Sequence, residues 1–405
     1  MILAALDYLP VSFREYLYHL YLSTSFNRPL LYKQKSNTHM ILGYSCRSIF
    51  ESIIMFYIEK NPNLKILTTP IHHSSFINII EKYIKPNNLY IIDINDNYNS
   101  IIDITNYDID LCIITHLFGQ DINCKYLIDN KHKFKAETVF IEDRVQGGTF
   151  LKEYSNNFID ISIYSCGMDK KPCGLGGGIV LFKESNSSSQ IIECLIPYLK
   201  MKISNYSSEH FYNRFLFVIK KLPTFLLYNN KWFINLVLRL FSILNIDLYT
   251  FSCNYRKNNP GFEHDYYNKN PSNGTLHSIN YAIQPENYLK IENLYQNKCN
   301  MFFSKLKDNT IIKMFKWNTQ KSTLLTPYNT ISVDDTNHLV KYLNNKNIPV
   351  MPNPTYKIFN FEHNNKDKYK KFNDSLVYLP SLAIMNEEEI EYLAILINDY
   401  FDMNS

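Results

Sequence analysis

The sequence lacks several features that mark specialised protein classes. Its eight cysteines include no C-x-x-C pair, and their spacing fits neither a zinc site nor a disulfide framework. No stretch of about 18 uncharged apolar residues occurs, so we expect no membrane-spanning helix. The opening MILAALDYLP has no basic segment and reaches an acidic residue at Asp7, which is unlike a signal peptide. These absences favour a reducing, cytoplasmic location.

The chain also lacks a strong excess of either charge. It has 42 Lys and Arg against 38 Asp and Glu, a net charge of +4, so nothing in the charge balance predicts a nucleic-acid partner. Apolar residues make up 45% and charged residues 20%, which is typical of globular proteins. Because 405 residues exceed what one hydrophobic core usually serves, we predict two lobes.

The pattern of apolar residues divides the chain into four regions. Residues 1–35 have a helical rhythm and predict an N-terminal helical arm. In 36–190, short β-branched runs alternate with helical stretches, which indicates an α/β domain with a mostly parallel sheet covered on both faces. Residues 191–265 predict an amphipathic helical insertion, and 266–405 a smaller α/β C-terminal domain. A parallel sheet places ligands at the carboxyl ends of its strands.

Within the insertion, residues 205–250 combine aromatic, leucine and basic residues, and they predict two amphipathic helices. Two interpretations stay open. The helices can form a subdomain packed on their own protein, or they can lie in a membrane interface with Lys220, Lys221, Lys231 and Arg239 facing lipid phosphates.

Three short segments carry residues suited to chemistry. In YSCGMDKKPCGLGGGIVLF, Lys170 follows a predicted strand and precedes a glycine cluster that lets the backbone approach a bulky ligand. In TVFIEDRVQGGTF, Asp143 ends an apolar strand and Gln146 follows one turn later. In ILGYSCRSIFESI, a polar turn begins an apolar helix whose N-terminus can bind phosphate. The plainer alternatives are a glycine-rich hairpin with surface lysines, an acidic helix cap and a serine N-cap.

In this order and spacing, these segments resemble the DegT/DnrJ/EryC1/StrS aminotransferases. The family's F-S-F-x-x-x-K segment corresponds to YSCGMDK, its E-D-x-x-Q to IEDRVQ, and its H-L-F-G to THLFGQD at 115–121. The family's closing LP and E-E-E correspond to LVYLPSLAIMNEEEIEYL. The resemblance implies the type I fold of pyridoxal-phosphate-dependent transferases, which is aspartate-aminotransferase-like, with pyridoxal 5′-phosphate (PLP) as cofactor.

The resemblance also implies a role for each matched residue. Lys170 would hold PLP as a Schiff base and later move a proton. Asp143 would pair with the ring nitrogen, and Gln146 would contact the ring oxygen. The phosphate would be bound by Ser165, Cys46, Arg47 and Ser48. His73 lies where the family has an aromatic residue stacked on the ring. Asn270 lies in YYNKNPSNGT, the nearest match to a motif that a neighbouring subunit donates.

Some positions depart from the family, and some alternatives remain open. Cys46 replaces a glycine, Arg47 a threonine and Cys166 an aromatic residue, while His73 could equally be a plain surface histidine. The resemblance implies transfer of an amino group, from glutamate, to a nucleotide-linked keto sugar by a homodimer. The alternatives are a PLP-dependent lyase or dehydratase, in which histidine would be expected at the Lys170 position, and a non-catalytic membrane-associated protein of the same fold.

Overall fold

The computed structural model of the chain describes most of its residues. The described ranges are 11–29, 38–96, 98–119, 121–147, 158–168, 170–183, 189–222, 225–226, 236, 240, 243–244, 267–314, 329–346, 348, 350–353, 356–360 and 365–404. The second amphipathic helix predicted within 205–250 lies almost wholly outside them.

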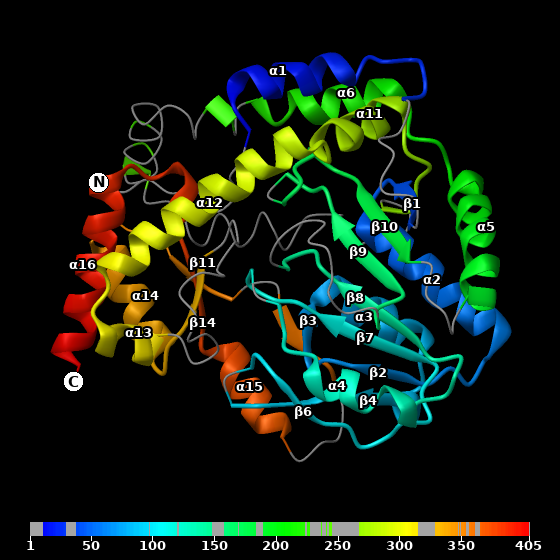
Figure 1. Ribbon diagram of the computed structural model, residues 1–405. Helices are drawn as coiled ribbons and strands as arrows, with labels where there is room; N and C mark the ends of the chain where they lie inside the picture. Colours follow the sequence, from blue (N-terminus) through cyan, green and yellow to red (C-terminus); the bar gives the residue numbers. More distant parts are fainter. Residues whose placement is uncertain are drawn as a thin grey trace.

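A seven-stranded sheet forms the centre of the larger lobe (Figure 1). Only β10 runs against the other strands, so the predicted α/β class with a mostly parallel sheet is confirmed. The inner strands are rich in β-branched residues and fully buried along their length, which requires cover on both faces. In spatial order the strands are β1 (Thr38–Gly43), β10 (Gly178–Lys183), β9 (Ile161–Ser165), β8 (Val139–Asp143), β7 (Leu111–Thr115), β2 (Ile66–Thr68) and β4 (Leu89–Ile91).

Helix α2 (Cys46–Lys60) anchors the helical layer on this sheet. Ser45 caps it in a reciprocal pair with Ser48, and its long apolar face packs on β1, β9 and β10. It also packs against its neighbours α3 and α5. The remaining elements of this lobe are α3 (Ser74–Tyr83), α4 (Lys125–Asp129), α5 (Ser189–Asn205), η1 (Pro86–Asn88), η2 (Lys131–Lys133), β5 (Asp93–Ile94) and β6 (Ile101–Asp103).

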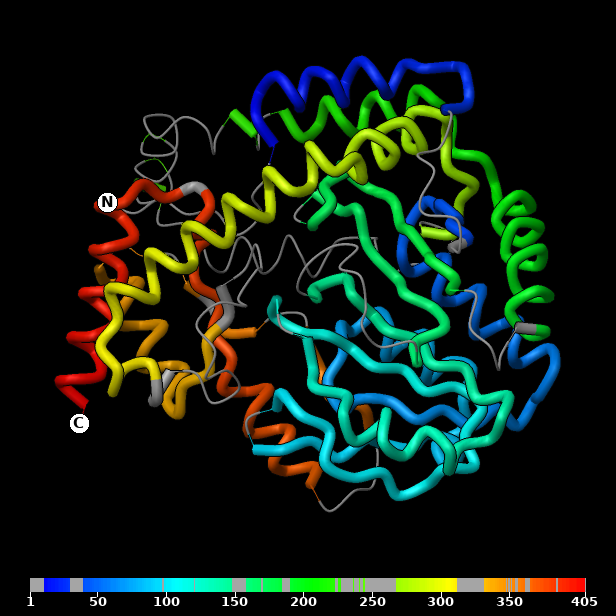
Figure 2. The backbone as a smooth tube through the Cα atoms, in the orientation of Figure 1, coloured from blue at the N-terminus to red at the C-terminus, as the bar shows by residue number. Residues whose placement is uncertain are grey.

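A second buried cluster surrounds a three-stranded antiparallel sheet near the C-terminal end of the chain. Figure 2 shows the long helix α12 (Pro285–Lys305) running from the larger lobe to this second core. The other elements here are α13 (Asp308–Met314), β11 (Asn329–Ser332), α14 (Thr336–Asn345), β12 (Met351–Pro352), α15 (Lys366–Asp374), β14 (Leu376–Leu379), η4 (Leu382–Ile384) and α16 (Glu387–Met403). Strand β13 (Tyr356–Ile358) pairs with β3 (Ile71–His73) and joins the two lobes.

Three helices pack together at one end of the larger lobe: α1 (Phe13–Leu22), α6 (Phe211–Ile219) and α11 (Asn273–Ala282). The first lies in the predicted N-terminal arm, and α6 is the described part of the predicted amphipathic pair. Helix α6 is tied to the protein by two contacts. The Tyr16 hydroxyl donates to the carbonyl of Val218 at 2.7 Å, and the buried Arg214 donates to the carbonyls of Gly174 and Leu175. The first helix of the predicted amphipathic pair is therefore packed on the rest of the chain.

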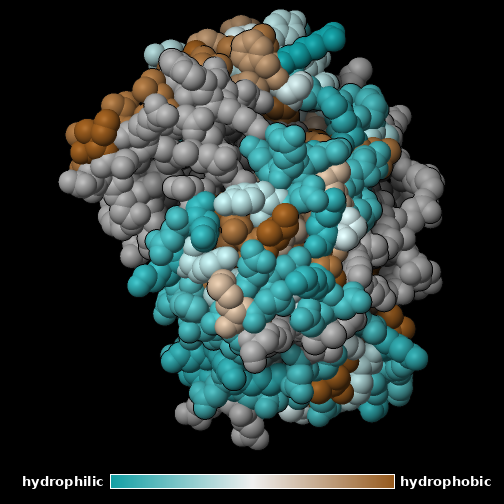
Figure 3. All heavy atoms as spheres, turned by 90° about the vertical axis from the view of Figure 1, so that its left-hand side faces the viewer, coloured by the Kyte–Doolittle hydropathy of each residue, from teal (hydrophilic) through white to brown (hydrophobic). Residues whose placement is uncertain are grey.

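The outer surface of α1 is nonetheless apolar. Phe13, Leu17 and Tyr21 recur at helical spacing on its exposed side, and Phe26 beyond the helix is 73% exposed. Figure 3 shows hydrophobic patches at the top of the molecule, where α1 lies in Figure 1. In the described part of the chain, every helix is too short or too polar to cross a bilayer.

Candidate active site

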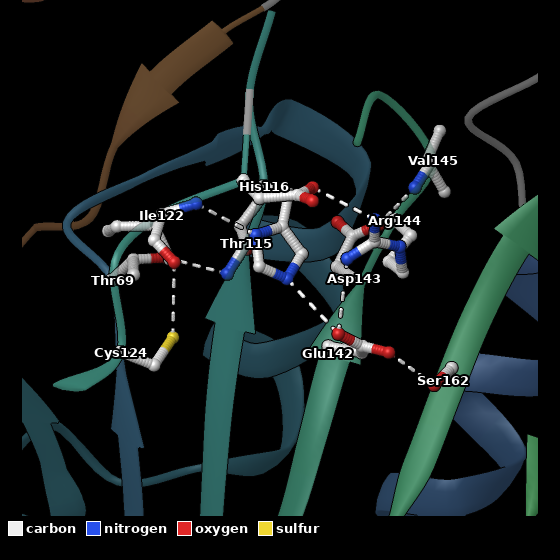
Figure 4. Close-up of polar contacts among 11 residues, drawn as sticks. Thr69, Thr115, His116, Ile122, Cys124, Glu142, Asp143, Arg144, Val145 and Ser162 are labelled. Carbon is white, nitrogen blue, oxygen red and sulfur yellow. Dashed lines mark hydrogen bonds and ion pairs between the residues drawn. The ribbon is translucent and has the colours of Figure 1, made fainter. Parts of the chain in front are cut away.

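Asp143 lies at the carboxyl end of β8, beside Thr115 at the end of β7 (Figure 4). Its carboxyl group is buried, and its Oδ1 accepts the backbone N–H of Val145 at 3.0 Å. Burial raises the pKa of Asp143 to about 7, although this N–H and the charge of Lys170 act in the opposite direction. The carboxyl group is therefore shielded from water, and a cationic ligand group would stabilise its ionised form.

His72 is the aromatic side chain next to this carboxyl group. Its Nδ1 lies 3.9 Å from Asp143 Oδ2, and its Nε2 lies 2.6 Å from the Thr115 hydroxyl and 2.9 Å from the Thr68 hydroxyl. Burial lowers the pKa of His72 to about 3, with a smaller contribution from its neighbour His73. The ring is neutral at neutral pH, so its contact with Asp143 is not an ion pair.

His73, which the sequence predicted as the ring-stacking residue, points elsewhere. It caps α3 by accepting the Ser75 N–H at Nδ1, and its ring centroid lies 5.9 Å from that of Tyr356. Consecutive residues of a strand face opposite sides, so only one of the two histidines of β3 can face Asp143. The structure brings His72 to the site instead. The pattern H-H gave no indication of which one, because β3 is only three residues long.

Lys170 lies in a loop that begins directly after β9. The loop is closed at its base, where the N–H of Cys166 donates to the carbonyl of Gly177, and the carbonyl of Cys166 accepts the N–H groups of Gly174 and Gly176. Burial and Asp143 raise the pKa of Cys46, while the charges of Arg47 and Lys170 oppose them. This loop follows β9, the neighbour of β8, and the charge of Lys170 acts on Asp143 at the end of β8 and on Cys46 in the first turn of α2.

The next residue, Lys171, has a different environment. Burial lowers its pKa to about 8, and Glu292 of α12 is the main opposing charge. Two adjacent lysines thus lie in the loop, one within electrostatic reach of Asp143 and the other of α12.

The predicted phosphate residues converge at one edge of the sheet. In the register of the strands, Gly178 lies opposite both Gly43 and Ser165. A Cβ atom on Gly178 would come within 2.4 Å of the backbone nitrogen of Cys46, so only glycine permits this approach of β10 to α2. Cys46, Arg47 and Ser48 form the first turn of α2. The first-turn N–H groups of a helix lack intrahelical carbonyl partners and attract anions, so this edge fits a phosphate.

Residues 267–270 lie against the turn formed by residues 43–48, which we call the anion turn. The Ser45 hydroxyl donates to the carbonyl of Tyr267 at 3.3 Å. Asn270, predicted to contact a cofactor, makes two backbone hydrogen bonds within the protein. Its N–H donates to the carbonyl of Ser207, and its carbonyl accepts the N–H of Glu209.

Gln146 follows Asp143 by one turn and is also buried. Its carbonyl accepts the N–H of Gly119 at 2.8 Å, which ties the HLFG segment to the end of β8. A cavity of about 30 Å³ lies beside this segment, with Thr69, Thr115 and Phe118 among its lining residues. Phe118 has a φ of 56°, a left-handed conformation that costs energy for a bulky side chain.

Glu142, one residue before Asp143, forms a separate buried network that the sequence did not indicate (Figure 4). It accepts hydrogen bonds from Ser162, from His116 at 3.2 Å and from Arg144 at 3.3 Å. Burial by itself raises the pKa of Glu142, but the His116 hydrogen bond and the Arg144 charge outweigh it and lower the pKa below its usual value. Arg144 also binds Asp121 at 2.8 Å. In the described ranges, no cluster of three or more His, Cys, Asp or Glu side chains is suited to a metal ion.

Comparisons with known proteins find structural likeness without sequence likeness. No family model matches the chain, and no curated protein matches its sequence. Among solved structures, the PMP form of a protein described as a sugar aminotransferase of Streptococcus pneumoniae has a TM-score of 0.64 at 12% identity, covering 98% of this chain and 99% of that one.

Two further solved structures are similar over comparable lengths. The E. coli GDP-4-keto-6-deoxy-D-mannose-3-dehydratase with hydrated PLP has a TM-score of 0.61 at 15% identity, covering 98% of this chain and 100% of that one. The 3-amino-5-hydroxybenzoic acid synthase has a TM-score of 0.61 at 10% identity, covering 99% and 100%. At this identity the likeness establishes the fold alone. The chain therefore has the type I fold of pyridoxal-phosphate-dependent transferases, as its sequence predicted.

Proposed function

We propose that the chain is a PLP-dependent aminotransferase that moves an amino group, from glutamate, to a nucleotide-linked keto sugar. One observation carries this proposal: Lys170 lies in the loop that follows β9, next to β8 with its buried terminal Asp143, and its charge acts on Asp143 and on Cys46 in the anion turn. A lysine, a carboxylate and an anion site are what PLP requires for its aldehyde, ring nitrogen and phosphate. The solved structures with this fold include a protein described as a sugar aminotransferase, which supports the substrate class.

The residues present fit the cofactor. Asp143 is a buried carboxyl group whose ionised form needs a cationic partner, as a protonated pyridine ring provides. Ser165 and the first turn of α2, with Arg47, would hold the phosphate. His72, the buried aromatic side chain beside Asp143, would lie against the ring. Gln146 would contact the ring oxygen.

When bound, PLP supplies a ring that withdraws electrons from the substrate's α-carbon. Lys170 would hold the cofactor through its Nζ, and its amine would take the proton from the α-carbon of the amino donor. Asp143 would stay ionised beside a protonated ring nitrogen, and its burial would keep water from that pair of charges. The lysine at position 170 favours transamination over the dehydratase alternative, for which histidine is expected there.

The experiment that tests this function is spectroscopic and chemical. The purified protein with PLP should show a visible absorbance band that glutamate shifts to the pyridoxamine form. Borohydride reduction and peptide mapping should then place a pyridoxyl group on Lys170. Lys171→Ala is the matched control, since it should keep the band while Lys170→Ala loses it. A label on Lys171, or a protein that gives no band with PLP, would contradict the proposal.

In the family that the sequence resembles, the active site is built at the interface of a two-fold dimer, so we also propose a homodimer. Sedimentation should give twice the 47.9 kDa mass of the chain. A monomer with full transaminase activity would refute this part alone.

A further inference from the structure

Glu51 is a fully buried acidic residue on α2, just under one turn beyond the anion turn. A buried carboxylate is costly unless hydrogen bonds and an opposite charge compensate it. Here the carboxylate joins three segments that are distant in sequence: α2, α3 and residues 267–270.

Four side chains donate hydrogen bonds to the Glu51 carboxylate. Oε1 accepts from the Lys82 amine at 2.9 Å and from the Tyr83 hydroxyl at 2.7 Å. Oε2 accepts from the Tyr267 hydroxyl at 3.1 Å and from the Asn268 amide at 2.7 Å. A carboxylate, which only accepts, suits this set, whereas a glutamine amide would turn an N–H group towards two donors.

The Tyr267 and Asn268 bonds hold residues 267–270 against the anion turn. The guanidinium of Arg47 lies 5.2 Å from the centroid of the Tyr267 ring. In the reciprocal direction, the amine of Lys269 lies 5.7 Å from the centroid of the Tyr44 ring. Each segment thus places a cation over an aromatic ring of the other, an arrangement that fixes both cations beside the N-terminus of α2.

We propose that Glu51 is a positioning residue: through Tyr267 it holds Arg47 and Lys269 at the anion turn and so sets the affinity of the turn for a phosphate group. This inference rests on the proposed function insofar as the phosphate is that of PLP. In the family that the sequence resembles, the position of Arg47 has threonine, which is short. The arginine side chain is long and flexible, so this chain needs additional contacts to hold its guanidinium in place. The two ring contacts and the Glu51 bonds supply it.

The test compares a phosphorylated and a phosphate-free ligand. Apoprotein of the wild type and of Glu51→Gln is titrated with PLP and, separately, with pyridoxal, following the visible band. We expect Glu51→Gln to weaken PLP binding by about 10- to 100-fold, by analogy with the loss that follows when a residue orienting a metal ligand is changed. Pyridoxal binding should stay unchanged, because it lacks the phosphate.

Two further variants guard the interpretation. Glu59→Gln is the matched control. Glu59 is also on α2 and also accepts a hydrogen bond from a tyrosine, the Tyr198 hydroxyl at 2.7 Å, but it is exposed and lies at the far end of the helix. It should leave both affinities unchanged. Tyr267→Phe keeps the ring beneath Arg47 and removes only the hydroxyl bonded to Glu51, so it should lower PLP affinity by a smaller factor. It answers the question if Glu51→Gln does not fold.

The outcomes separate this inference from the proposed function. Equal losses of PLP and pyridoxal binding in Glu51→Gln would mean a general structural role and would overturn the proposal, as would unchanged PLP binding. If the wild type gives no band with PLP, the proposed function fails, and calorimetry with inorganic phosphate then decides on Glu51. Weaker phosphate binding by the variants than by the wild type supports the positioning role, and equal binding overturns it.

Discussion

Strand β8 ends in two adjacent carboxyl groups whose surroundings differ. Glu142 and Asp143 are both buried, and as consecutive strand residues they face opposite sides of the sheet. On the Glu142 side, Ser162, His116 and Arg144 supply hydrogen bonds and positive charge, and the pKa falls below its usual value. On the Asp143 side, burial dominates and the pKa rises to about 7.

The difference separates a structural carboxylate from one prepared for a ligand. Both carboxylate oxygens of Glu142 accept hydrogen bonds within the protein, and these bonds tie β8 to β9 and to the loop after β7. Asp143 has a backbone donor, a neutral histidine at 3.9 Å and the charge of Lys170, yet its pKa stays raised, so a cationic group that binds there would further stabilise its charge. Perturbed carboxylates in such settings are typical of active sites.

The largest expected effect is on catalysis at Asp143. Asp143→Asn keeps the shape of the side chain but cannot carry the charge opposite a protonated ring, so kcat should fall by about 100- to 1000-fold. Single-turnover rates with glutamate measure the effect. Glu142→Gln is the comparison variant, and an equal fall in both would remove the distinction between the two carboxylates.

A second effect is the pH dependence of stability in the apoprotein. Because the folded pKa of Asp143 is raised, the native state holds its proton more tightly, and the free energy of unfolding falls as pH rises from about 4 to about 7. The loss is on the order of 4 kcal/mol, from about 1.4 kcal/mol per pKa unit. Denaturant unfolding of wild type and Asp143→Asn should therefore diverge over this range.

His72 has the opposite linkage. Its pKa is lowered to about 3, so its stabilising contribution is present above about pH 6.5 and is lost as pH falls. His72 is present in both proteins, so its contribution cancels in the difference between the two curves. Parallel curves for wild type and Asp143→Asn would show that Asp143 titrates normally.

A third effect is the stability of the Glu142 network. Glu142→Gln leaves Arg144 buried without one of its two carboxylate partners, and we expect a loss of about 3 kcal/mol. Urea unfolding at pH 7 measures it. A loss below about 0.5 kcal/mol would mean that the network contributes specificity without net stability.

The smallest effect is at the solvent edge of the same network. Asp121 also binds Arg144, but its side chain is 35% exposed, so water screens the interaction. Asp121→Asn should cost less than about 1 kcal/mol by the same measurement. A cost as large as that of Glu142→Gln would show that burial does not decide the strength of these two pairs.

Much of the larger lobe follows from local pattern. The runs LCIIT, VFIED and ISIYS are β-branched and bounded by polar loops, and they became β7, β8 and β9 with their polar residues at the strand ends. Asp143 and Ser165 were identifiable for that reason, as was the turn at Ser45, whose capping pair with Ser48 is local. Glu51 was not identifiable, because a single acid in an apolar helix shows nothing of the donors that reach it from residues more than 200 positions away.

The sequence by itself determined the fold class and the residue types at the strand ends, because these depend on local periodicity and on the spacing of motifs along the chain. The tertiary structure alone decided which of two adjacent histidines faces Asp143, and that Lys170 acts on Asp143 while Lys171 acts on α12. Those choices depend on the pairing of β3 with β13 and on the hydrogen bonds between Cys166 and the following glycines that close the loop after β9. Such contacts join residues far apart in sequence, and their free energy depends on burial and charge that appear only when the lobes are packed.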